Sequence, residues 1–235
     1  MGREESGFTI IETMLYLGVT GLLAIGVLTS AGHAINVQRY RDAVDSLVTY
    51  LQSQYDETVN VQIDHATDLS CAANHIDVGS GLGRGMGDCV VLGKFVQTTD
   101  GTSFTSATVF GKLSSTPASS DLDAVKNAAP FTSTDTVVPS TYRLEWGARI
   151  LQPHSNTTQA PLSILIVRSP ASGEVMSFVG YSSGDTPMTL TNSAPADTLL
   201  CVEPVGFLTN DRMGALLAQG TSNSSGVKRA SGGVC

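Results

Sequence analysis

The strongest constraint on this chain is a long stretch without formal charge near its N-terminus. Thr13–Gln38 contains 26 residues and no Asp, Glu, Lys or Arg, and Glu12 comes immediately before it. As an α-helix this stretch would be ~39 Å long, which is enough to cross a bilayer. A carboxylate in the middle of a bilayer costs about 2.5–3.5 kcal/mol on insertion scales. We therefore expect Glu12, at the edge of this helix, to have a functional reason.

The helical pattern continues beyond the charge-free stretch. Apolar residues recur at spacings of three and four, which is typical of an amphipathic helix: Val37, Tyr40, Val44, Leu47, Leu51 and Tyr55. We predict one helix from about Phe8 to about Thr58, ~75 Å long at 1.5 Å per residue. Its apolar stripe should pack on a β-sheet, because a lone helix would leave the stripe exposed.

The residues before this helix carry a family resemblance. Ser6-Gly7-Phe8-Thr9-Ile10-Ile11-Glu12 resembles the class III signal of type IV pilins and pseudopilins. In that family a dedicated peptidase cleaves after the Gly, methylates the new N-terminal residue and needs a Glu at the fifth mature position. Gly7, Phe8 and Glu12 occupy these places, so the resemblance implies cleavage after Gly7 and an N-methylated Phe8.

The same resemblance implies the domain organisation. Residues 1–7 would be a prepilin leader peptide, and residues 8–36 the transmembrane and assembly half of the helix. Residues 37–58 would be its amphipathic half, and residues 59–235 a globular, β-rich extracytoplasmic domain. We expect an α+β, type IV pilin-like fold, in which the long helix packs on an antiparallel β-sheet with a disulfide-closed C-terminal loop.

Two other interpretations of the N-terminus remain open. An ordinary secretory signal could be cut after Ala34, where Gly32 and Ala34 supply small residues, although its acidic start and Glu12 disfavour it. A plain membrane anchor gives no reason for Glu12. The basic residues are also unusual, because Arg39 and Arg41 follow the helix and a count of basic residues would place that end in the cytoplasm. Long domains that follow a helix are translocated largely regardless of this count.

Glu12 is expected to serve filament assembly. Cleavage after Gly7 would expose a cationic amine on Phe8, and a buried amine and a buried carboxylate each carry a desolvation cost unless they pair. We expect Glu12 to pair with the Phe8 amine of a neighbouring subunit. The alternative is that the Glu12 side chain merely reaches back to the membrane surface.

The remainder of the chain reads as strands and turns. Runs rich in Val, Ile, Phe and Tyr predict strands at Cys89–Gln97, Phe104–Lys112, Tyr142–Leu151, Leu162–Arg168, Glu174–Val179 and Leu199–Glu203. Pro170–Gly173 is typical of a hairpin turn, and Asp121–Ala128 is expected to form a short helix within a long polar excursion. The Gly-rich segment between Cys71 and Cys89 is expected to be a flexible loop, and the small, polar residues from Gly220 to Cys235 are expected to fray without a disulfide.

The four cysteines favour disulfides. An even number of cysteines without a C-x-x-C pair, in a chain expected to be exported, indicates disulfides and not zinc or redox chemistry. Three connectivities are open. We prefer Cys71–Cys89 and Cys201–Cys235, because each pair closes a loop rich in Gly and Ser.

The sequence gives no pattern of an enzyme. The four histidines lie in unrelated contexts, and neither a G-x-S-x-G nor an H-E-x-x-H motif is present. Asp64, His65 and Asp68 cluster, but a polar loop after the helix explains them better. We expect no catalytic residues, no cofactor and no metal site.

The expected function is a structural subunit, major or minor, of a type IV pilus or a similar filament. The partners that the resemblance implies are the prepilin peptidase, other pilin subunits and a membrane assembly platform. The precursor would cross the bacterial inner membrane once, and the mature subunit would lie in an extracellular filament or at the cell surface. A type II secretion pseudopilin is an alternative, because Leu199–Val227 is similar to the last strands of H-type pseudopilins and related minor pilins.

The other alternative is a minor tip pilin that binds DNA or a surface ligand. Lys228 and Arg229 in the C-terminal segment are the candidate DNA contacts. Two cations make few phosphate contacts, and the chain carries a net charge of −8, so DNA is an improbable partner. A basic face built from other residues would reverse that judgement, and its members would be Arg84, Lys94, Lys112, Arg143 and Arg149.

Overall fold

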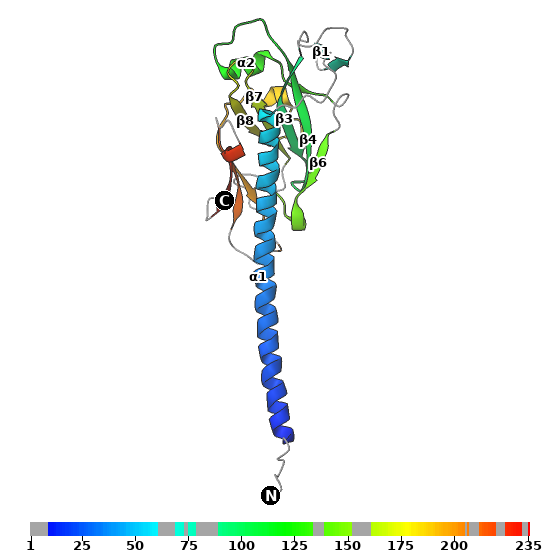
Figure 1. Ribbon diagram of the computed structural model, residues 1–235, viewed down its shortest axis with the longest axis vertical. Coiled ribbons are helices and arrows are strands. Elements are labelled where there is room, and N and C mark those ends of the chain that lie inside the picture. The colour runs from blue at the N-terminus through cyan, green and yellow to red at the C-terminus, as the bar shows by residue number, and fades with distance from the viewer. Residues whose placement is uncertain are drawn as a thin grey trace.

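The computed structural model describes residues 9–60, 69–72, 75–78, 89–133, 139–151, 161–204, 206, 212–219, 224–231 and 235. Its longest element is the helix α1, Ile10–Val59, which has 50 residues. Thr9 caps the first turn by accepting a hydrogen bond from the Glu12 amide, and Asn60 closes the last turn by donating to the Asp56 carbonyl. Figure 1 shows that the globular part packs along only the C-terminal part of α1, so the N-terminal part projects alone. The continuous helix that the sequence predicts is confirmed.

The main sheet is antiparallel and has six strands. Its order is β5-β4-β3-β7-β8, and β6 also pairs with β4. The strands are β3 Cys89–Thr98, β4 Ser103–Lys112, β5 Phe131–Thr132, β6 Ser140–Arg143, β7 Leu162–Arg168 and β8 Val175–Gly180. Gly93 lets β3 and β7 approach each other, because a Cβ atom there would collide with the Ile166 carbonyl.

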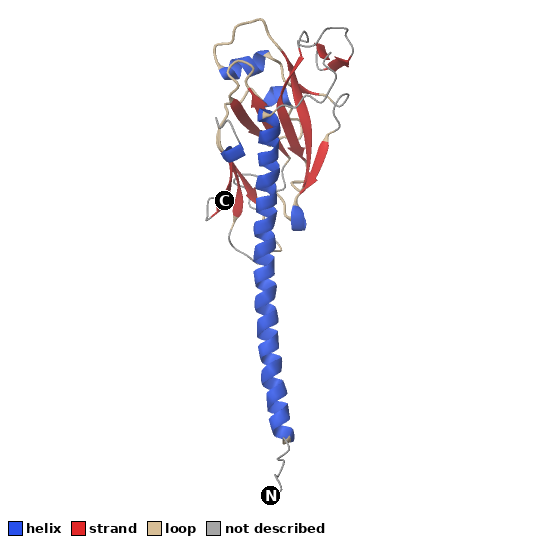
Figure 2. Ribbon diagram, in the orientation of Figure 1, coloured by secondary structure: helices blue, strands red, loops and turns tan. Residues whose placement is uncertain are grey.

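A second antiparallel sheet lies beside the first against α1 (Figure 2). It has the order β11-β10-β9, with β9 Thr198–Val202, β10 Met213–Leu217 and β11 Val227–Ser231. A short hairpin, β1 Leu69–Ala72 with β2 His75–Val78, forms a separate pair. The short helix α2 spans Asp121–Asn127. Three helical turns complete the described elements: η1 Glu145–Gly147, α3 Pro187–Leu190 and η2 Ser224–Gly226.

The largest hydrophobic cluster lies between α1 and both sheets. The helix contributes a stripe of fully buried side chains, with 0% of Tyr40, Val44, Leu47 and Leu51 exposed. Residues from β7, β9 and β10 pack against this stripe. Burying one Leu or Val side chain contributes roughly 1.5–3 kcal/mol, so the stripe fixes the helix to both sheets.

A second cluster covers the opposite face of the main sheet. β7 is central to both clusters, and its side chains alternate between them as the two-residue period of a strand requires. Ile164 and Ile166 face α1, whereas Leu165 and Val167 pack with Val125 of α2. The main sheet is therefore covered on both faces, which explains why β7 is an almost continuous apolar run.

The fold is α+β, as predicted, and most predicted strands are confirmed within one or two residues. Two predictions are wrong. The predicted strand Tyr142–Leu151 is interrupted by η1, because Trp146 and Gly147 adopt left-handed backbone angles that a strand cannot contain. The segment between Cys71 and Cys89 is not a simple loop, since it includes β2. The segment after Gly220 contains the paired strand β11, which the sequence did not predict. The Cys201–Cys235 disulfide is formed, so fraying of this segment without a disulfide stays a prediction.

Candidate functional site

The N-terminal part of α1 carries most of the large exposed apolar side chains among the described residues. None of residues 10–39 is buried, and we call this segment the exposed half of α1. Its large side chains project from the helix, with Ile10 77% and Leu22 73% exposed. An apolar surface of this size marks an interface with a protein or a membrane. α1 is also the one helix, among the described residues, that is long and apolar enough to cross a membrane.

Glu12 lies in the first turn of this exposed half. Its backbone amide donates to Thr9 Oγ1 at 3.3 Å, and its side chain is exposed. Thr9-Ile10-Ile11-Glu12 has the T-x-x-E spacing of a capping box, and a carboxylate in the first turn also complements the helix dipole. The geometry therefore offers Glu12 a local role that the sequence analysis did not consider. Gly7 and Phe8, the predicted cleavage site, lie outside the described residues.

The C-terminal part of α1, residues 40–59, is the packed half, and polar contacts fix it at several heights. The Tyr40 hydroxyl donates to the Val202 carbonyl at 2.8 Å and accepts from the Met213 amide at 2.9 Å. Gln52 Nε2 donates to the Val227 carbonyl at 3.0 Å. Near the end of the helix, Glu57 forms an ion pair with Lys94 at 2.8 Å. The first buried residue is Tyr40, three residues beyond the predicted start of the amphipathic half.

The strand β6 is fixed to the packed half by aromatic contacts. The Tyr142 ring stacks on Tyr50 with centroids 4.2 Å apart, and the Tyr142 hydroxyl is 2.7 Å from Ser46 Oγ. Burial raises the pKa of Tyr50 to about 12 and also raises the pKa of Tyr142. Both phenols are therefore neutral at physiological pH and pack as apolar rings.

Both preferred disulfides are present in the structure. Cys71 of β1 is bonded to Cys89 at the start of β3, with Cα atoms 5.0 Å apart. Cys201 of β9 is bonded to Cys235, with Cα atoms 5.6 Å apart and a sequence separation of 34. The first bond joins the small hairpin to the main sheet, and the second joins residue 235 to the second sheet.

The candidate DNA contacts lie on β11 and point in opposite directions. Arg229 turns toward α1, where its Nη1 contacts the two carboxylate oxygens of Asp45 at 3.0 and 3.1 Å. Lys228 is exposed on the other face of the strand. The two cations therefore do not share one face of the strand, and the charge of Arg229 is already neutralised by Asp45.

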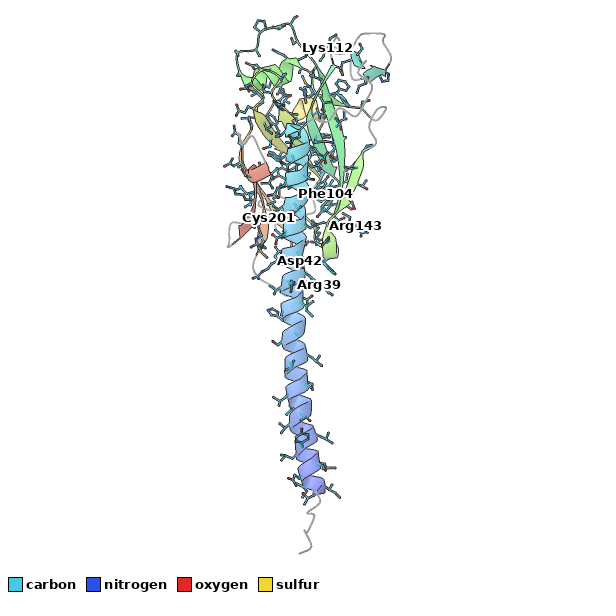
Figure 3. The ribbon with its side chains drawn as sticks, in the orientation of Figure 1. Arg39, Asp42, Phe104, Lys112, Arg143 and Cys201 are labelled. Atoms are coloured by element: carbon cyan, nitrogen blue, oxygen red, sulfur yellow. A yellow bond between two sulfur atoms is a disulfide. The ribbon has the colours of Figure 1, made fainter. Side chains whose placement is uncertain are left out.

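The alternative basic face is not assembled either. Lys94 is paired with Glu57, and Arg149 is paired with Glu203. Lys112 and Arg143 lie at opposite ends of the globular part (Figure 3). Arg84 lies outside the described residues, as do Asp64, His65 and Asp68. Among the described residues no group of three or more His, Cys, Asp or Glu is placed to hold a metal ion.

Sequence reasoning missed two contacts between distant segments. One is the ion pair of Asp45 with Arg229, and the other is the stacking of Arg39 on Trp146, whose ring centroid lies 4.8 Å from Arg39 Cζ. Neither contact has a local signal, because each joins α1 to a residue more than a hundred positions away in the sequence. Trp146 could have been noticed as the chain's single tryptophan, followed directly by a glycine.

The long apolar N-terminal helix, the β-sheets and the disulfide near the C-terminus are compatible with a type IV pilin. The chain matches no family model, no curated protein and no solved structure. The functional argument therefore depends on the division of α1 into an exposed half and a packed half.

Proposed function

We propose that this chain is a structural subunit of a type IV pilus or a type IV-like filament. The observation that carries the proposal is that one continuous helix has a packed half and an apolar exposed half without a partner. A soluble monomer would expose this surface to water at a large cost, whereas a membrane and then a filament of like helices would cover it. In this proposal the exposed half anchors the precursor in the membrane and later packs against neighbouring subunits.

The glycines of the exposed half support helix packing. Gly18, Gly21 and Gly26 each have open space where a Cβ atom would lie, so the chain's own fold does not require them. Each costs about 1 kcal/mol of helix propensity relative to Ala. Small residues on apolar helices let neighbouring backbones approach closely, which is a gain only when another helix is present.

The N-terminus of the mature chain tests the proposal. We expect membrane or filament material to begin at an N-methylated Phe8, and N-terminal mass spectrometry measures this directly. A mature start at Ile35 would indicate an ordinary secretory signal and would remove the assembly helix, contradicting the proposal. The abundance of the chain in sheared filaments then distinguishes a major from a minor subunit.

A secretion pseudopilin is the second candidate. This candidate is supported by β9 and β10, which coincide with the two strands of the H-type resemblance, and by Ser225-Gly226-Val227, which follows them at η2 and the start of β11. Deleting the gene of this chain would then abolish protein secretion while leaving surface pili intact. We rank the DNA-binding tip pilin below both, because Arg229 is paired with Asp45.

A further inference from the structure

The turn η1 lies at the end of the globular part from which the exposed half of α1 projects (Figure 2). Its central residue, Trp146, is 54% exposed and has backbone angles φ 57° and ψ 19°. A bulky residue in the left-handed region is uncommon and persists where its surroundings hold it. The turn therefore presents a large aromatic ring to the outside at an energetic cost, which calls for a functional reason.

The ring is fixed relative to α1. The guanidinium of Arg39 stacks over it, with Cζ 4.8 Å from the ring centroid, a cation–π geometry. Immediately before the turn, the Leu144 amide donates to the Thr102 carbonyl at 2.8 Å and the Leu144 side chain is buried. β6 precedes it and is held to α1 by the stacking of Tyr142 on Tyr50. Trp146 therefore lies at a defined height along the helix.

The position of Trp146 along α1 coincides with the surface of a bilayer that the charge-free stretch would span. The charge-free stretch Thr13–Gln38 is ~39 Å long as a helix, and a bilayer with its headgroups is about 40–45 Å thick. When this stretch spans the membrane, Glu12 and Arg39 fall in the two opposite headgroup layers. The ring of Trp146, in contact with Arg39, then lies in the same headgroup layer as Arg39.

We propose that Trp146 and Arg39 together form a lipid-headgroup contact that docks the globular part on the outer surface of the membrane before assembly. The inference rests on the proposed membrane anchoring of α1. Indole rings are enriched at the headgroup level because one edge is polar and the body is apolar. The Arg39 guanidinium is a suitable donor to lipid phosphates.

The surrounding charges fit this partner. In residues 39–42 of α1 and residues 143–145 before Trp146, the exposed charged residues are three cations, Arg39, Arg41 and Arg143, and two carboxylates, Asp42 and Glu145. Figure 3 shows Arg39 and Asp42 where α1 leaves the globular part, and Arg143 on the same end of the globular part. The contact also gives a reason for the basic residues after the membrane span, which run against the usual charge distribution. They would bind headgroups on the outer side.

The single tryptophan allows a direct test. The full chain is reconstituted in phosphatidylcholine–phosphatidylglycerol vesicles, with either ordinary lipids or lipids brominated near the carbonyl end of the acyl chain. We expect the brominated lipids to quench Trp146 emission several-fold more than that of a matched control, W146F with L113W. Leu113 is 49% exposed and follows Lys112, at the opposite end of the globular part (Figure 3).

Flotation of the vesicles distinguishes a failure of the proposed membrane anchoring of α1 from a failure of the headgroup contact of Trp146. If the chain floats with the vesicles and the quenching of Trp146 equals that of the control, the headgroup contact is wrong and the membrane anchor stands. If the chain does not float, the proposed anchoring fails and this inference fails with it. Quenching that is lost as the protein-to-lipid ratio rises would assign the ring to a neighbouring copy, which also overturns the inference.

Discussion

The two halves of α1 have the same backbone and opposite environments. In residues 40–59 a stripe of apolar side chains is buried against both sheets, while in residues 10–39 no side chain is buried. The packed half has charged residues on its outer face, so its amphipathic pattern is completed within the monomer. From Thr13 to Gln38 the exposed half carries no formal charge, and its large apolar side chains face every side of the helix, so one flat partner cannot cover it. This difference supports our proposal that a membrane, and then a bundle of like helices, covers the exposed half.

The largest effect that would test this division is expected at Glu12. Removing one partner of a buried ion pair costs about 3–5 kcal/mol, so Glu12→Val should lower filament incorporation by at least ~100-fold. Glu12→Gln is the matched control, because Gln keeps the capping-box spacing but lacks the charge. Immunoblots of sheared filaments and of membranes measure assembly and insertion separately.

The two outcomes at Glu12 distinguish its roles. We expect Glu12→Gln to fail as Glu12→Val does, with both chains still inserted in the membrane. Normal incorporation of the Gln variant would instead assign Glu12 to the cap with Thr9 and would contradict the intersubunit pair.

A matched pair of Leu→Ala changes compares the halves directly. Leu47 is 0% exposed and Leu22 is 73% exposed. Leu47→Ala should lower the free energy of unfolding of the globular part by about 2–5 kcal/mol, because it leaves a cavity. Leu22→Ala should leave that free energy unchanged, which chemical denaturation followed by near-ultraviolet circular dichroism measures. Equal effects would mean that the exposed half also packs on the globular part.

Removal of the Cys201–Cys235 disulfide tests whether the contacts of β11 with the packed half are enough to keep this strand in place. Replacing Cys201 and Cys235 together by Ser opens a loop with a sequence separation of 34, worth roughly 3–4 kcal/mol in the chain-entropy model. We expect a lower midpoint of unfolding, with β11 losing amide protection first. Hydrogen exchange of β11 amides that stays unchanged would show that Gln52 and Asp45 hold the strand without the disulfide.

Alkaline pH should loosen the contact of β6 with the packed half. The pKa of Tyr50 is raised by burial from 10.0 to about 12. The folded state therefore favours the neutral phenol. The contribution of Tyr50 to the free energy of unfolding is complete below pH 10 and is lost as the pH rises toward about 12. Ultraviolet titration of tyrosinate and circular dichroism should change together above pH 10. Tyr50→Phe should reduce this pH dependence.

The smallest expected effect is that of the ion pair on β11. Asp45 and Arg229 are about half exposed, and such pairs contribute about 0.2–1 kcal/mol. Asp45→Asn should therefore destabilise the globular part only slightly while freeing the Arg229 guanidinium. If duplex DNA binding rises in an anisotropy titration of Asp45→Asn and falls again in Asp45→Asn with Arg229→Ala, the strand has latent phosphate affinity. Unchanged weak binding in both would exclude β11 as a DNA contact.

The sequence predicted local features better than contacts between distant segments. The helix was predictable because both the charge-free stretch and the spacing of Val44, Leu47 and Leu51 are periodic signals. The disulfide pairs were preferred from the composition of the loops that they close. By contrast, β11 was missed because Val227 is its one large apolar residue. Its pairing with β10 depends on tertiary packing that short-range patterns do not contain.

The candidate site was only partly predictable for the same reason. The position of Glu12 at a helix start follows from Thr9 and the residues beside it. The pairing of Arg229 with Asp45, and the stacking of Arg39 on Trp146, arise when segments from the middle and the end of the sequence pack on the N-terminal helix. The left-handed backbone of Trp146 also has no signal in the sequence, since the propensities of the surrounding residues favour continuation of the strand.

The several attachment points of α1 have a mechanical consequence. Tyr40, Gln52 and Glu57 fix the helix to the sheets over ~26 Å of its length at 1.5 Å per residue. A pull directed along α1 therefore loads these contacts together, in shear, and they share the tension. A pull directed sideways on the exposed half would load Tyr40 first and peel the helix away contact by contact. We infer that the subunit resists tension along α1 far better than a sideways force on the exposed half.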